Sequence, residues 1–217
     1  MRMRGAAAVK GSLRGLCVAM VSILGTGDAM AIEEAAYTVT ARDGAFEIRD
    51  YAPHVVAETL VEGTLEEAGN KAFNRLFRYI SGGNRSREKV AMTAPVSQQP
   101  QGEKIAMTAP VAQQRVQERW SVSFTMPASY TLETLPAPDD PTITLRPVPT
   151  RRMAAVRYSG LWSEKNYLQN RSELEAWIRE QGLTAAGDPV WARYNPPFTP
   201  WFMRRNEILI PLAADVK

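Results

Sequence analysis

The chain has 217 residues, of which 45% are hydrophobic and 23% charged, and its formal net charge is +3 at pH 7. Four of the 26 basic residues and one of the 23 acidic residues lie in residues 1–31, which leaves 22 of each in residues 32–217. This balance lacks the basic excess by which proteins attract nucleic acid or anionic membranes. We therefore expect no nucleic-acid partner.

The first 31 residues have the pattern of a secretory signal. Basic residues precede an apolar run, Leu16 to Leu24, and Ala29-Met30-Ala31 fits a small-x-small cleavage site. The run is shorter than the roughly 20 residues that span a bilayer. We expect cleavage after Ala31, export to the periplasm, and a mature single domain of residues 32–217 without an integral membrane segment. The single cysteine, Cys17, would leave with the signal.

The mature region opens with strands and one well-delimited helix. Three strands are predicted first: 36–40, 46–51 and 55–62. Asp43-Gly44 is a typical hairpin turn between the first two. Thr64 and Glu67 have the spacing of a capping box, and Gly82-Gly83 ends the apolar helical periodicity that follows. The sequence therefore predicts a helix between these two signals.

The next segment repeats itself. Residues 88–96 are followed fifteen residues later by the closely similar 103–111, and both copies end in Met-Thr-Ala-Pro-Val. We expect two strands that end in this string, and then a third, alternating strand over 120–126. These elements complete a first half of the order β-α-β-β.

A second half follows the proline-rich divider 136–141. Its predicted elements are strands at 143–146 and 153–158, a helix capped by Ser163 and ending near Glu180, and strands at 190–194 and 207–210. Two halves of the same order predict an antiparallel α+β domain with pseudo-twofold symmetry.

The usual catalytic constellations are missing from the sequence. Residues 32–217 contain one histidine, His54, and no thiol, so neither a Ser-His-Asp nor a Cys-His system can be assembled. There is no glycine-rich phosphate loop and no histidine or cysteine pair with zinc-ligand spacing. The sequence therefore favours a binding protein over an enzyme.

The first helix has a wide apolar face. Phe73 and Phe77 extend this face to an arc of about 180°, whereas packing on a sheet needs about 100°. Lys71, Arg75 and Arg78 form a basic stripe on the other side at i, i+4 and i+7. Two interpretations stay open: a helix with an ordinary core and solvated face, or a surface for a flat apolar ligand with anionic arms.

The loop from 195 to 206 is also unusually apolar. It contains three prolines and the large side chains Phe198, Trp201, Phe202 and Met203, next to Arg204. A proline-stiffened loop loses little entropy on ordering and can form the lid of a pocket. It can equally well plug the end of the sheet.

Several strings resemble the SOUL haem-binding family. They are 46–53, the helix end at 82–84, the duplicated 88–96 and 103–111, 120–127, and 204–211. The resemblance covers most of residues 37–212. It implies a distorted antiparallel β-barrel with two flanking helices, built from two pseudo-symmetric β-α-β-β halves.

The resemblance also implies a tetrapyrrole site beside the first helix and the loop before the last strand. By position, the site residues are Phe73, Arg75, Phe77, Arg78, Pro197, Trp201, Met203 and Arg204. Some members have a histidine where this chain has Asp50, which argues against histidine-ligated iron there. His54, four residues on, is the remaining candidate for an axial ligand.

The expected function is that of an exported carrier or buffer that holds haem or a related tetrapyrrole in a shallow apolar site, as a monomer or weak oligomer. Three alternatives stay open. They are a binding module for another flat amphipathic molecule, an enzyme of tetrapyrrole turnover, and an interaction protein whose Phe-rich surface contacts another subunit.

Overall fold

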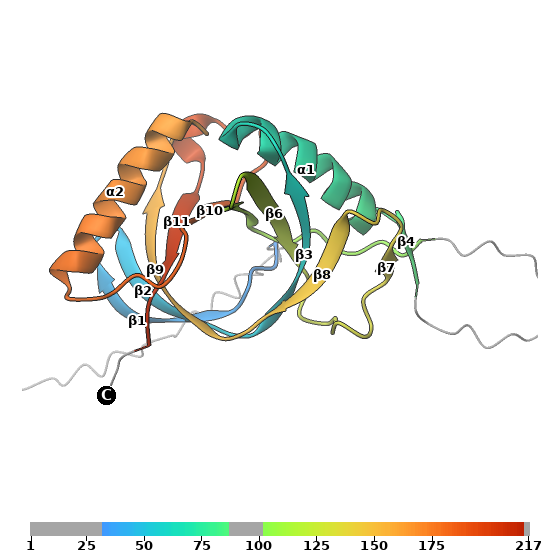
Figure 1. The fold of residues 1–217 in the computed structure, drawn as a ribbon, viewed down its shortest axis with the longest axis horizontal. Coiled ribbons are helices and arrows are strands. Elements are labelled where there is room, and N and C mark those ends of the chain that lie inside the picture. Colours follow the sequence, from blue (N-terminus) through green and yellow to red (C-terminus); the bar gives the residue numbers. More distant parts are fainter. Residues whose placement is uncertain (1–31, 87–101, 215–217) are drawn as a thin grey trace, which may run out of the picture. The chain divides into compact units, whose positions relative to one another are not determined.

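The computed structural model describes residues 32–86 and 102–214, in which nine strands form one curled antiparallel sheet with two α-helices on one of its faces (Figure 1). The helices are α1 (Leu65–Ile80) and α2 (Glu164–Glu180). The strands of this sheet are β1 (Tyr37–Asp43), β2 (Phe46–Tyr51), β3 (His54–Val61), β5 (Val111–Val116), β6 (Arg119–Thr125), β8 (Ile143–Val148), β9 (Arg151–Tyr158), β10 (Val190–Arg193) and β11 (Asn206–Pro211). The short strands β4 (Asn84–Arg85) and β7 (Ala137–Pro138) pair separately. The predicted α+β class and distorted barrel are confirmed.

The strand order is β1-β2-β9-β11-β10-β5-β6-β3-β8, and it contains the predicted halves. The unit β3-α1-β5-β6 and the unit β9-α2-β10-β11 have the same order, and they meet where β5 pairs with β10. However, β2 pairs with β9 and β8 pairs with β3, so each half gives one strand to the other. The sequence did not predict this exchange.

Helix α1 begins where its capping signal predicted. The Thr64 hydroxyl accepts a hydrogen bond from Glu67 N, and Thr64 N donates to the Glu67 carboxylate, each over 3.3 Å. The helix ends before Gly82, whose φ of 111° favours glycine. Its small buried residues, Ala68 and Ala72, bring the helix close to β3 and β6.

Helix α2 begins at the predicted cap. The Ser163 hydroxyl accepts from Asn166 N over 3.3 Å, and the helix packs on β9 and β11. Leu174, Trp177 and Ile178 form its buried stripe. None of the helices in the described ranges is long and apolar enough to cross a membrane.

The cross-strand register assigns side chains to the two faces of the sheet. On the helix-covered face one row runs, in order, through Ala57, Phe124, Val111, Arg193, Asn206 and Tyr158. Neighbouring residues along each strand point the other way. The opposite face carries a second, smaller core of Tyr51, Met153, Ala155, Ala192 and Leu209. Each face can therefore hold a site of its own.

The repeated string was wrongly predicted to end a strand. In the second copy the strand β5 begins at Val111, the last residue of the string. Pro110 has no N–H to donate to a ladder, so regular pairing starts after it. The segment before it is held by Asn84, whose side chain bonds Glu103 N over 2.9 Å and Glu103 O over 2.8 Å. The first copy, 88–96, lies outside the described residues.

Candidate functional site

The outer side of α1 exposes a pair of aromatic rings. Phe73 is half-buried, and its ring meets that of Phe124 on β6 edge-on at 5.5 Å. Phe77, one turn further, stacks on Phe73 at 5.8 Å with 10° between the ring planes, and 46% of it is exposed. The two rings continue the core onto the surface, as the wide apolar arc predicted. They form a flat apolar platform, which we call the Phe73–Phe77 platform.

Two arginines lie on the other flank of α1 from this platform, on the side of Asp140. Within the described ranges, neither Arg75 nor Arg78 forms a salt bridge. The two positive charges act on the carboxyl group of Asp140. Its pKa is lowered mainly by hydrogen bonds from Thr142 and to a smaller degree by the two arginines. Both guanidinium groups are therefore available to an anionic ligand.

The loop before β11 points its large side chains outward. Trp201 and Met203, in the short 3-10 turn Trp201–Met203, are 56% and 64% exposed, and Phe198 is 86% exposed. Of the two open interpretations, this exposure favours a loop that faces outward over one whose large side chains plug the end of the sheet. Arg204 braces the loop, because its Nε and Nη2 donate to Thr199 O over 2.8 Å and Pro197 O over 2.7 Å.

The two predicted groups of site residues are placed apart. No hydrogen bond, ion pair or ring contact joins Phe73, Arg75, Phe77 or Arg78 to the loop residues 197–204 in the part of the chain that the structure describes. In Figure 1 the connection between β10 and β11 lies near the upper edge, between the two helices. The described structure therefore shows no polar or ring contact between the loop and the platform.

A buried arginine that the sequence analysis missed lies between the two groups. Arg193, the last residue of β10, is 9% exposed, and its Nε has no hydrogen-bond partner. Among the described residues its guanidinium makes one long hydrogen bond, 3.4 Å from Nη2 to Gln113 Oε1. The guanidinium carbon lies 5.1 Å from the ring centres of both Trp162 and Trp191. No acidic side chain of residues 32–86 or 102–214 neutralises it.

This environment is unfavourable for a charge. Burial lowers the pKa of Arg193 to about 10, which still leaves the guanidinium protonated at neutral pH. Burying an unpaired charge destabilises the fold by several kcal/mol. The two cation–π contacts offset this only in part, because each stabilises by about 0.5–2 kcal/mol. The hydroxyl of Tyr158 and the indole N–H of Trp191 are also buried in the described structure, where they interact with each other and with no carboxylate. Two features of the sequence could have indicated the Arg193 site: a charged residue within a buried strand, and a glycine within α1.

That glycine is Gly69, and it accommodates Arg193. A Cβ at position 69 would lie 2.4 Å from Arg193 Nη2, so the guanidinium packs directly against the helix backbone. Gly69, Phe73 and Phe77 are four residues apart and form one row along α1. Arg193 therefore marks one end of the Phe73–Phe77 platform, and the apolar loop starts two residues after it.

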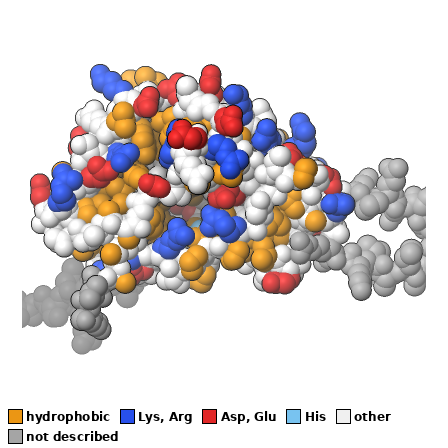
Figure 2. All heavy atoms as spheres, viewed as in Figure 1, with side chains coloured by type: hydrophobic (Ala, Val, Ile, Leu, Met, Phe, Trp, Pro, Cys, Tyr) orange, Lys and Arg blue, Asp and Glu red, His pale blue; other side chains and the backbone are white. Residues whose placement is uncertain are grey.

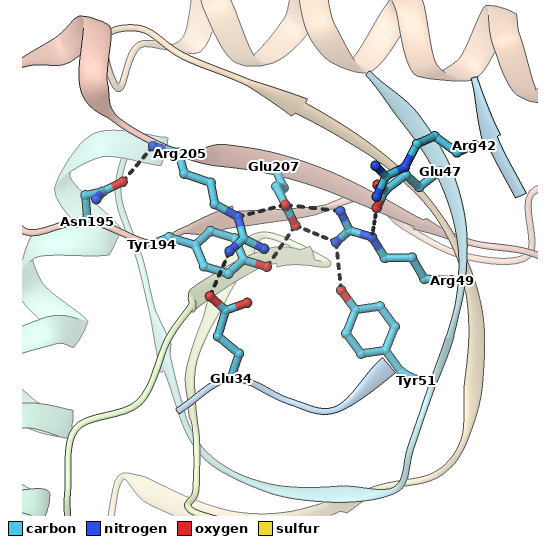
Figure 3. Close-up of polar contacts among 9 residues, drawn as sticks. All are labelled: Glu34, Arg42, Glu47, Arg49, Tyr51, Tyr194, Asn195, Arg205 and Glu207. Carbon is cyan, nitrogen blue, oxygen red and sulfur yellow. Dashed lines mark hydrogen bonds and ion pairs between the residues drawn. The ribbon is translucent and has the colours of Figure 1, made fainter. Parts of the chain in front are cut away.

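The opposite face of the sheet carries a saturated charge cluster, which we call the Glu207 cluster (Figure 3). Glu207 is fully buried and accepts two bonds from Arg49, of 2.6 and 3.1 Å, one from Arg205 Nε at 3.0 Å and one from the Tyr194 hydroxyl at 2.8 Å. Arg49 also donates to the Tyr51 hydroxyl over 3.1 Å. Every charge in the cluster therefore meets an opposite charge.

The pKa shifts follow from this pairing. Burial opposes ionisation of Glu207, but its hydrogen bonds and charge contacts with Arg49 and Arg205 outweigh burial, so the pKa of the carboxyl lies below its usual value. Burial raises the pKa of Tyr51 to about 12 and that of Tyr194 further still. The cluster is a fixed ion-pair network with no group that titrates near neutral pH.

A cavity of about 120 Å³ lies beside this cluster. Its lining includes Tyr51, His54, Glu58, Met153 and Leu209. Pockets for drug-sized ligands are usually about 300–1,000 Å³, so a tetrapyrrole does not fit inside without rearrangement. The cavity suits a ligand the size of a single aromatic ring.

His54 belongs to this cavity and not to the α1 side. On β3, His54 and Glu58 line the cavity, whereas Ala57 contributes to the core under α1. The His54 Nδ1–H donates to Ala52 O over 2.9 Å when that nitrogen carries the proton. The sequence prediction placed His54 and the platform in one site, and the sheet separates them. No cluster of three metal-ligating side chains occurs among the described residues.

Charged side chains of both signs are interspersed on the face of the molecule drawn in Figure 2, with hydrophobic side chains between them. This view contains no broad basic field. The prediction that nucleic acid is not a partner agrees with this distribution and stays a prediction.

The family model and the two relatives described below all carry the description of haem-binding proteins. The model of the family described as "SOUL heme-binding protein" matches residues 32–211. Heme-binding protein 1 from Xenopus tropicalis is 26% identical over 169 residues, which is 77% of this chain and 84% of that protein. Heme-binding protein 1 from Mus musculus is 25% identical over 150 residues, which is 69% of this chain and 74% of that protein.

Solved structures resemble the chain in fold alone. A hydrolase from Listeria innocua matches with a TM-score of 0.52 at 10% identity, over 80% of this chain and 94% of that one. EcmrR in a complex with DNA matches with a TM-score of 0.55 at 10% identity, over 77% of this chain and 56% of that one. The family match supports haem as a bound ligand and a binding protein rather than an enzyme. Because that match spans most of the chain, this protein belongs to the SOUL haem-binding protein family.

Proposed function

We propose that this protein binds haem or a related tetrapyrrole on the helix-covered side of the sheet, with one face of the macrocycle on the Phe73–Phe77 platform. The observation that carries the proposal is the stacked, partly exposed ring pair at the surface of α1. Stacking on such rings suits a flat aromatic ligand, and affinity would come mainly from buried apolar area.

The arginines on the other flank of α1 supply the polar part of the site. Arg75 and Arg78 have no ion pair within the described ranges, and each can pair with a propionate near water. Such partly exposed pairs contribute up to about 1 kcal/mol each. Pro197, Trp201, Met203 and Arg204 would border the ligand at the N-terminal end of α1.

Iron ligation by histidine is not part of this proposal. His54 is the single histidine of the chain and lies on the opposite face of the sheet. We therefore expect haemin and iron-free protoporphyrin to bind with similar affinity. Replacing His54 by Ala should leave the haemin absorption spectrum and affinity unchanged, and loss of binding in this variant would contradict the proposed position.

We further propose a role as an exported carrier or buffer. A site without a firm iron ligand releases its ligand readily, which suits transfer better than redox catalysis. Export is inferred from the signal-like residues 1–31. N-terminal sequencing of protein recovered from the periplasmic fraction tests it, and a first residue of Ile32 is the expected result.

The direct test is a titration of the purified protein with haemin and with protoporphyrin, followed by porphyrin absorbance. We expect saturable one-to-one binding. Phe77→Asp should weaken it about tenfold or more, because it places a charge on the apolar platform. The matched control is Leu168→Asp on α2, where the leucine is exposed to a similar degree, 49%.

Charge reversal separates electrostatic from apolar contributions. The double variant Arg75→Glu/Arg78→Glu should weaken binding, whereas Lys165→Glu/Arg179→Glu on the exposed side of α2 should not. Non-saturating binding that is indifferent to Phe77→Asp and to both charge reversals would show adhesion without a dedicated site.

A second candidate function rests on the cavity of about 120 Å³. Its lining combines apolar side chains with Glu58, whose pKa stays below its usual value because hydrogen bonds from Arg146 and Ser121 outweigh burial. An ionised carboxylate in an apolar recess suits a small cationic aromatic molecule. Protection of the protein against thermal unfolding by benzamidine, lost in Glu58→Gln, would favour this function.

A further inference from the structure

The charge of Arg193 is the least compensated feature of the described structure. Its guanidinium is nine-tenths buried, its Nε has no hydrogen-bond partner, and no carboxylate of residues 32–86 or 102–214 pairs with it. By contrast, Arg49 is buried to a similar extent and meets Glu207 in a two-bond ion pair. A buried guanidinium that lacks this partner is an incomplete site.

The surroundings of Arg193 provide further hydrogen-bond donors. The indole N–H of Trp191 and the hydroxyl of Tyr158 are also buried, and the two groups interact with each other. Arg193 and Tyr158 lie in the same cross-strand row on the helix-covered face, separated by Asn206 on β11. An interaction with the indole N–H leaves the hydroxyl proton of Tyr158 free, so the guanidinium and the hydroxyl both offer donors to an anion, and a carboxylate accepts from several donors at once.

The position of Arg193 relative to the platform fits a ligand that has both an apolar plane and a carboxylate. Phe124, under the Phe73 ring, and Arg193 lie in the same row with one strand, β5, between their strands. Two strand spacings correspond to about 10 Å. A porphyrin ring with a propionate arm covers this distance.

Trp162 packs against both Arg193 and Arg204. Its indole is half-buried and lies between two guanidinium groups, with Arg193 at 5.1 Å and Arg204 at 4.3 Å from the ring centre. One hydrogen bond of 2.8 Å, from Nε1 to Asn206 Oδ1, holds it. A carboxylate that displaces this ring meets Arg193 from inside and Arg204 from outside.

We propose that Arg193 is the buried anchor for a carboxylate of the ligand, so that one propionate of the macrocycle pairs with it while the ring lies on the Phe73–Phe77 platform. The inference rests on the proposed tetrapyrrole function and adds the residue that selects for an acidic side arm. Gly69 belongs to the same proposed site, since it leaves space for the Arg193 guanidinium at the end of the platform.

The test compares protoporphyrin with its dimethyl ester, which has the same ring and no carboxylate. Wild-type protein should bind the free acid about tenfold more tightly than the ester, because a charge-assisted pair is lost. Arg193→Met should bind both forms equally, and Arg193→Lys should keep part of the preference. The matched control, Arg179→Met on exposed α2, should behave as wild type.

The outcomes separate this inference from the proposed function. Equal binding of acid and ester by wild type, or a full preference retained in Arg193→Met, overturns the anchor while tetrapyrrole binding stands. If neither porphyrin binds, the proposed function fails, and the anchor is then tested with benzoate. A thermal midpoint raised by benzoate but not by benzyl alcohol, in wild type but not in Arg193→Met, supports the anchor; no difference overturns it.

Discussion

Two buried arginines on opposite faces of the same sheet have contrasting environments. Arg49 pairs with Glu207, and that carboxylate is bound in addition by Arg205 and Tyr194. Arg193 has two indole rings and one long hydrogen bond to a neutral amide. A saturated network stabilises a fold, whereas a buried, unneutralised charge lowers stability until something binds to it. The contrast therefore separates a structural face from a binding face.

The strongest test of the structural face is Glu207→Gln. The substitution keeps the shape but leaves Arg49 and Arg205 buried without their carboxylate. We expect a loss of about 3–5 kcal/mol in the free energy of unfolding, measured by urea denaturation. Glu58→Gln is the control, because its ion pair with Arg146 is partly exposed. A loss no larger than that of the control would contradict the assignment.

Acid should weaken the same cluster. The pKa of Glu207 in the folded protein lies below the reference value of 4.5, so the folded state binds fewer protons than the unfolded state in acid. Stability is therefore fully present above about pH 5 and falls as the pH decreases through the folded pKa. Thermal midpoints between pH 7 and pH 3 measure this fall. The Glu207→Gln variant should show a shallower decrease, and an equal slope would disagree with the assigned pairing.

Gly69→Ala tests how closely Arg193 packs on α1. The added Cβ would lie 2.4 Å from Arg193 Nη2, so the buried guanidinium has to move. We expect a loss of about 1–2 kcal/mol in wild type from overpacking. In the Arg193→Met background the same change should stabilise by up to about 1 kcal/mol, because alanine favours helix over glycine. Equal effects in both backgrounds would show that the two positions do not interact.

Arg193→Met should have the smallest effect on the ligand-free protein. It removes a buried charge that no described carboxylate balances, so we expect an unchanged free energy of unfolding or a gain of up to about 1 kcal/mol. Arg49→Met, its counterpart in the Glu207 cluster, should lose several kcal/mol in the same urea assay. Similar losses in both variants would remove the distinction between the two faces.

Much of the fold could be predicted from local signals. The capping residues Thr64 and Ser163 begin the two helices as predicted, and β2 has the predicted bounds of Phe46–Tyr51. The strand boundary at Val111 was not predicted, because the second copy of the repeat resembles a strand in composition. Its contact with Asn84, 19 residues away, holds the segment outside the ladder.

The candidate site was predicted less completely. The helical spacing of Phe73 and Phe77 predicted a wide apolar face, since side chains four residues apart share one side of a helix. Arg193 was missed, because a single arginine in a predicted strand has the same appearance whether its partner is present or absent. The structure does not bring His54 to the platform, and the sequence could not show this, since the face that a strand residue occupies depends on pairing with distant strands.

The sequence by itself determined the family, the two-half organisation, the helix limits and the aromatic platform, because capping, periodicity and characteristic strings are local properties of the chain. The tertiary structure decided which half supplies each edge strand, which face His54 occupies, and which buried arginine has a carboxylate. These outcomes depend on register between residues far apart in the chain. Glu207 meets Arg49 across 158 residues, whereas Arg193 meets no carboxylate among residues 32–86 and 102–214.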